Sequence, residues 1–88
     1  MYSLDEVLDQ LDRYHQRATY GAVGKLLDHP AAYLMGGRPR DKRHSWVVNQ
    51  DTHLPTGYTE EQIHPALNSR AEVISDVDEL AAWLHNPD

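Results

Sequence analysis

The chain contains no cysteine, and no apolar run in it approaches the length of a membrane span. Without thiols there can be no disulfides, thiolate metal sites, thiol catalysis or iron–sulfur clusters, and such a composition fits a reducing compartment. A membrane-spanning helix needs about 20 predominantly apolar residues. The N-terminal stretch Ser-Leu-Asp-Glu lacks the basic and apolar segments of a secretory signal. We therefore expect a cytoplasmic protein without a membrane partner.

Motifs for catalysis and for metal or cofactor binding are also missing. The six histidines are scattered, with no HxxxH spacing and no histidine–carboxylate pair on an evident helix face. The sequence GKLLDHP lacks the GxxxxGK[ST] form of a P-loop. His44 and Ser45 are adjacent, but neighbours on a strand point to opposite faces, so they cannot form a base and nucleophile pair. The sequence thus predicts no enzyme, no metal site and no cofactor.

The 88 residues fit one domain, 1–88, with a single modest core. Ser3 followed by Glu6 has the form of a capping box, which predicts a helix over about residues 4–16. Thr19 is placed to cap a second helix that reaches about residue 27. Gly21 and Gly24 weaken this helix but permit the close approach of another backbone.

A third helix is predicted after a tight corner at Asp28-His29, with Pro30 at its first position and Gly36-Gly37 as its end. Two short helices joined by so brief a corner predict a helix-turn-helix from about residue 19 to residue 37. A strand is predicted from about Ser45, because Trp46, Val47 and Val48 are strand formers, and a hairpin-like loop should follow it.

The C-terminal third contains weaker signals. Thr59 and Gln62 can cap one helical turn, and the apolar pair at residues 73–74 can form a short second strand. Ser75 should cap a final helix with an apolar stripe. The expected fold is therefore α+β, a small winged-helix-like domain in which a helix-turn-helix precedes a strand and hairpin and a C-terminal helix.

Positive charge is concentrated in one part of an acidic chain. Residues 17–44 contain six basic and two acidic residues, a net charge of +4, whereas the rest contains two basic and twelve acidic residues, a net charge of −10. Phosphate contacts require local positive potential, so one basic face could bind nucleic acid while the other faces stay acidic. A solvated loop that carries the arginines is the alternative interpretation.

Aromatic residues accompany this basic segment. Tyr20, Tyr33 and Trp46 could stack on bases or sugars, and backbone N–H groups near Thr19 and Pro30 could meet phosphates. Packing in the core is the alternative for all three rings, most strongly for Trp46. The candidate DNA-binding residues are Thr19, Tyr20, Tyr33, Arg38, Arg40, Lys42 and Arg43.

Five short stretches follow one another in a recognisable order: Thr19-Tyr20-Gly21, Val23, Ala31-Ala32, Gly36-Gly37 and Val47-Val48-Asn49. They resemble the DNA-binding segment of the alkylguanine-DNA alkyltransferases and the alkyltransferase-like proteins. The resemblance covers about residues 19–49. It implies a winged helix-turn-helix that enters the minor groove and rotates a damaged base out of the stack. Tyr20 would match the tyrosine that crowds the phosphate of the flipped nucleotide.

The sequence also departs from that family. His44 stands where the acceptor cysteine, or the tryptophan of the alkyltransferase-like proteins, would fall, so alkyl transfer to a thiol is impossible. Tyr33 replaces the arginine that fills the gap left by the extruded base. We therefore expect a non-catalytic DNA-binding protein, with His44 and Trp46 as candidates for a base pocket. The alternative is a small protein-interaction module that meets its partner through its acidic helices or residues 54–65.

Overall fold

Helix α1, Leu4–Tyr14, opens the part of the chain that the computed structural model describes, residues 2–87. The predicted capping box is confirmed: Glu6 N–H donates to Ser3 Oγ at 3.2 Å, and Ser3 N–H donates to Glu6 Oε1 at 3.0 Å. The helix ends two residues before the predicted limit, because His15 adopts a left-handed backbone conformation with φ 53°.

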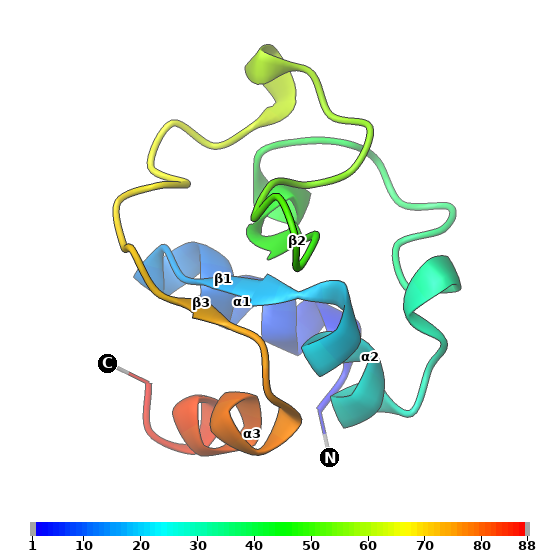
Figure 1. Cartoon of the computed structure of the whole chain (residues 1–88), viewed down its shortest axis with the longest axis vertical. Helices are drawn as coiled ribbons and strands as arrows, with labels where there is room; N and C mark the ends of the chain where they lie inside the picture. Colours follow the sequence, from blue (N-terminus) through cyan, green and yellow to red (C-terminus); the bar gives the residue numbers. More distant parts are fainter. Residues whose placement is uncertain (1, 88) are drawn as a thin grey trace.

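A three-stranded parallel sheet forms the centre of the fold, with strand order β2-β1-β3 (Figure 1). Strand β1 is Arg17–Thr19, β2 is Val47–Val48 and β3 is Val73–Ile74. Strands β2 and β3 fall within segments predicted to be strands, but β1 was not predicted, since three residues are too few to show a strand period. Each parallel pairing requires a long crossover, and the first crossover contains α2.

Helix α2, Tyr20–Leu27, is capped as predicted: Ala22 N–H donates to Thr19 Oγ1 at 3.1 Å. The predicted third helix is wrong. A single 3₁₀ turn, Ala31–Tyr33, takes its place, and further turns continue to Gly37. The few residues between Pro30 and the glycine pair are too short a run for a stable α-helix. The second half of the predicted helix-turn-helix is therefore a turn.

Gly24 lies where two parts of the backbone meet. His29 N–H donates to Gly24 O at 2.8 Å, and a Cβ atom built on Gly24 would lie only 2.7 Å from His29 O. The prediction that α2 admits a close backbone neighbour is thus confirmed at this position. At Gly21 the nearest atom to such a Cβ is Thr19 Oγ1 at 4.0 Å. Gly24 is therefore required by a close backbone contact, whereas Gly21 is not.

This difference predicts opposite effects of alanine substitution. Gly24→Ala should lower the free energy of unfolding by about 1–3 kcal/mol, because the new methyl group must displace the His29 carbonyl. Gly21→Ala is the matched control and should raise it by about 0.5–1 kcal/mol, because alanine favours the helix and meets open space. Urea denaturation of both variants measures the effects. Equal effects would contradict the close contact at Gly24.

The segment after the basic loop also differs from the prediction. Arg43–Trp46 forms a 3₁₀ turn, so the strand begins at Val47 and not at Ser45. The predicted loop does fold back, because Asn49 N–H donates to Leu54 O at 2.9 Å. No strand returns beside β2 within residues 2–87, and β2 pairs with β1 instead. The hairpin-like loop is therefore present, but among residues 2–87 it does not join β2 to a second strand.

The C-terminal third follows the sequence closely. A 3₁₀ turn, Glu60–Gln62, has the predicted capping box with Thr59. Helix α3, Val77–His85, is capped by Asp76 and not by Ser75, with the Asp76 carboxylate accepting from Asp78 N–H and Glu79 N–H, both at 3.1 Å. No helix among residues 2–87 is long and apolar enough to cross a membrane.

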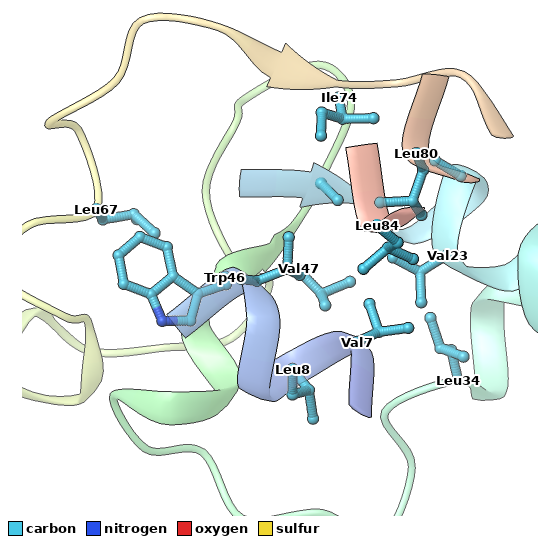
Figure 2. Packing of buried hydrophobic residues seen from close by; sticks show 13 residues of the cluster. Val7, Leu8, Val23, Leu34, Trp46, Val47, Leu67, Ile74, Leu80 and Leu84 are labelled. Carbon is cyan, nitrogen blue, oxygen red and sulfur yellow. The ribbon is translucent and has the colours of Figure 1, made fainter. Parts of the chain in front are cut away.

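The core lies between the helices and the sheet (Figure 2). It combines α1, the strands and both later helices, with Trp46 as its largest side chain. Figure 2 shows the Trp46 ring next to Leu67 and the α1 residues Val7 and Leu8 below Val47. A single core that draws on every helix supports one α+β domain.

Candidate nucleic-acid interface

The six basic residues of the segment 17–44 do not share one environment. Arg17 is only 6% exposed and holds three acceptors of the later loop. Its Nη1 donates to His53 O at 3.1 Å and to Asn68 Oδ1 at 3.0 Å, and its Nη2 donates to Arg70 O at 3.0 Å. Burial lowers the pKa of its guanidinium. Arg17 is a structural residue, and its inclusion in a basic surface is wrong.

Arg38 and Arg43 lie on the surface but are paired with carboxylates of α1. Arg38 Nη1 lies 2.7 Å from Asp5 Oδ1, and Arg43 Nη2 lies 2.8 Å from Asp9 Oδ1 and 3.5 Å from Asp5 Oδ1. The hydrogen bond and the charge of Arg38 lower the pKa of Asp5, and the hydrogen bond that Arg43 donates to Asp9 raises the pKa of Arg43. The two arginines thus contribute little net positive charge in the folded chain.

Arg40 has a different setting, beside a pocket of about 580 Å³. It has no ion-pair partner among the described residues. Its guanidinium packs on Gly57, where a Cβ atom would lie 3.4 Å from Arg40 Nε and Nη2. Gly57 has φ +78°, a backbone conformation that favours glycine. The absence of a side chain at Gly57 therefore leaves room for the guanidinium of the unpaired Arg40.

Two tyrosines line the same pocket, Tyr20 from the start of α2 and Tyr58 from the loop that follows Gly57. Thr56 N–H donates to the Tyr20 hydroxyl oxygen at 3.0 Å, so this hydroxyl keeps its own proton to donate. Burial raises the pKa of Tyr58 to about 12, so its phenol is neutral at physiological pH. The pocket thus offers a guanidinium and two phenol rings to a ligand.

His44 is buried and belongs to the structural framework of the Arg43–Trp46 turn. Its backbone N–H donates to Asp41 Oδ1 at 3.0 Å, and its Nδ1 lies 2.6 Å from the same oxygen. Burial opposes ionisation of Asp41, but these hydrogen bonds and the neighbouring charges outweigh it and lower the pKa of the carboxyl. His44 therefore has no open face at which a base could bind.

Trp46 is completely buried. Its Nε1 donates to Asp12 Oδ1 at 2.8 Å, and its ring is stacked on His15 with a centroid distance of 5.4 Å. The ring of His64 lies 4.9 Å from the indole on centroids. These contacts occupy the indole, so the alternative of core packing holds. The proposed base pocket at His44 and Trp46 is wrong in this structure.

The remaining candidates separate into buried and exposed residues. Thr19 is buried, and its hydroxyl caps α2, so it is not a surface contact. Tyr33 is 72% exposed and has a ring open to solvent. Lys42 is exposed and forms no ion pair within residues 2–87. Of the predicted residues, the structure brings together Tyr20, Arg38 and Arg40 at one pocket.

Sequence reasoning missed two groups near this site. Thr56 and Tyr58 lie in residues 54–65, which the sequence offers only as a segment that could meet a protein partner, although the Thr-Gly-Tyr order signals a turn that can present a ring. Asp5 and Asp9 belong to the acidic helices of the same alternative, and no pairing with the arginines was predicted for them. Their i, i+4 spacing places both carboxylates on one face of α1, and this is a signal that the sequence does contain.

Among the described residues, no group of three or more histidine, aspartate or glutamate side chains could hold a metal ion. No family model, curated protein or solved structure matches the chain. The candidate site is thus defined by its own geometry.

Proposed function

We propose that this chain is a non-catalytic DNA-binding protein whose contact face surrounds the pocket beside Arg40. The observation that carries the proposal is the unpaired Arg40 guanidinium next to the Tyr20 and Tyr58 rings. A guanidinium pairs with a phosphate through two parallel hydrogen bonds, and aromatic rings stack on bases or sugars. The Tyr20 hydroxyl proton can meet a second phosphate oxygen.

The proposed contact face also includes two exposed side chains that are close in sequence to residues of the pocket lining. Tyr33, on the 3₁₀ turn after α2, and Lys42, before the Arg43–Trp46 turn, supply a ring and a charge. Ala31 lines both the pocket and a neighbouring groove that contains Lys25. The arrangement we propose is winged-helix-like only in part: α2 supplies the first helix, and a turn and loop replace the recognition helix.

The salt dependence of binding tests this proposal. Each neutralised phosphate adds about 0.9 to the slope of log affinity against log salt, so three to five contacts predict a slope of about −2.7 to −4.5. Fluorescence anisotropy of a labelled duplex at several salt concentrations measures it. If no binding appears even at low salt, the proposal is wrong, and capture of one stoichiometric protein without nucleic acid would favour the protein-interaction alternative.

Arg40→Ala tests the position of the interface. We expect the affinity to fall by about tenfold and the magnitude of the salt slope to fall by about 0.9, because one charge-assisted phosphate contact is lost. Arg13→Ala is the matched control: Arg13 is exposed on α1, where it lies over the Tyr14 ring at 5.7 Å. Equal losses in the two variants would show an effect of net charge alone and would move the interface away from the pocket.

A further inference from the structure

Helix α1 presents two carboxylates to the arginines that border the proposed DNA-binding face. The Asp5 and Asp9 side chains are 61% and 67% exposed, so both are accessible to solvent while they hold Arg38 and Arg43. Arg43 Nη2 also donates to the backbone oxygen of Asp5 at 3.3 Å. The two arginines and two aspartates form one surface cluster, which we call the α1 clamp, and it has no net charge.

The two sides of the α1 clamp come from different kinds of element: the carboxylates lie on helix α1, whereas Arg38 lies in a loop. The capping box at Ser3 and the buried residues Val7, Leu8 and Leu11 hold α1 in place. Arg38 follows the glycine pair in a loop, and its side chain reaches across to the helix. A long flexible arginine that is held by a fixed carboxylate can be released by neutralising the carboxylate alone.

We propose that the α1 clamp is an autoinhibitory contact that withholds Arg38 and Arg43 from DNA. An electrically neutral cluster releases few counterions from DNA, and its exposed carboxylates repel the phosphate backbone. The unpaired cations in and beside the contact face are Lys25, Arg40 and Lys42. The resting chain therefore binds DNA through these three residues alone. This inference concerns the regulation of that face and rests on the proposed function.

Neutralising both aspartates tests the inference. The double variant Asp5→Asn with Asp9→Asn keeps the side-chain shapes and leaves Arg38 and Arg43 unpaired. We expect the salt slope to steepen from about −2.7 in the unaltered chain to about −4.5, because two phosphate contacts are added. An exposed ion pair typically shifts an equilibrium by at most about fivefold, so low-salt affinity should rise by about five- to twentyfold. Duplex anisotropy on both proteins gives both quantities.

The matched control is Glu72→Gln with Glu79→Gln, which changes the net charge equally. Both glutamates are exposed, and neither forms an ion pair within the described part of the chain. The control should keep a slope near −2.7. An equal gain in the control would overturn the inference in favour of net charge. The reciprocal variant, Arg43→Gln with Asp9→Asn, removes one ion pair of the α1 clamp at constant net charge and should keep a slope near −2.7. A flatter slope would show that Arg43 already contacts DNA.

The outcomes separate the two proposals. If the unaltered chain binds DNA and the aspartate variant binds no better, the α1 clamp is only structural, and DNA binding still stands. If the unaltered chain does not bind DNA at low salt, both proposals fall, whatever the aspartate variant does. Thermal melts of each protein establish that it is folded. Should the double aspartate variant not fold, the single variant Asp9→Asn, with an expected slope of about −3.6, decides the question.

Discussion

Replacing Trp46 with alanine is expected to lower the free energy of unfolding by about 3–5 kcal/mol. The indole is completely buried, packs against both His15 and His64, and donates to Asp12. Its removal leaves a cavity at the centre of a small core. Such a loss is a large share of the stability of a domain of this size, which is typically about 5–15 kcal/mol. Urea denaturation followed by circular dichroism measures it.

Tyr33→Ala is the matched control for this prediction. Tyr33 is the most exposed large apolar side chain of those described, so its removal should change the free energy of unfolding by less than about 0.5 kcal/mol. Tyr33→Ala should weaken DNA binding more than Trp46→Ala does, because an open ring can stack on a base. Should Trp46→Ala leave stability intact and abolish binding, the core assignment of Trp46 would be wrong and the base-pocket hypothesis would return.

Arg17→Met is expected to lower the free energy of unfolding by about 2–4 kcal/mol. The buried guanidinium is the only donor that the described residues provide to Asn68 Oδ1, and it also holds the backbone oxygens of His53 and Arg70. Methionine fills similar space but leaves all three acceptors without this donor. The loss is smaller than three full charge-assisted bonds, because removing the guanidinium also removes the cost of burying its charge.

Two measurements define the effect at Arg17. Urea denaturation gives the stability, and amide hydrogen exchange should show faster exchange across residues 50–70, which Arg17 ties to β1. Arg17→Lys should give an intermediate loss, because one ammonium cannot reproduce the planar fork of donors. Arg13→Met, which changes an exposed arginine, should have little effect. Equal losses at positions 13 and 17 would contradict the structural role of Arg17.

Local signals predicted the elements whose stabilising contacts are close in sequence. The Ser3–Glu6 capping box, the Thr19 cap and the Thr59–Gln62 capping box all join residues three positions apart, so they can be read directly from the chain. The pattern at residues 30–37 is also local, but it led to the wrong prediction of a third α-helix. Proline and the glycine pair do bound a run of turns, but too few residues separate them to form an α-helix.

The sequence was least informative about which basic residues contribute positive charge to a surface. The concentration of basic residues between positions 17 and 44 is real, yet three of the six are held by partners 33 or more residues away. Arg17 is buried under the later loop, and Arg38 and Arg43 are neutralised by α1. Only Lys25, Arg40 and Lys42 remain without a carboxylate partner among the described residues. A net charge summed along the chain therefore overstated the charge of any one surface.

The sequence by itself determined the class of fold, the starts of the first two helices and the absence of thiol chemistry, because each depends on composition or on residues within one turn of each other. The tertiary structure alone decided that the sheet is parallel, that Trp46 belongs to the core and that Arg40 lies beside Tyr20 and Tyr58. These features require segments separated by tens of residues to meet. Such contacts form only when burial of apolar surface brings the segments together. No local sequence pattern indicates which distant segments will come into contact.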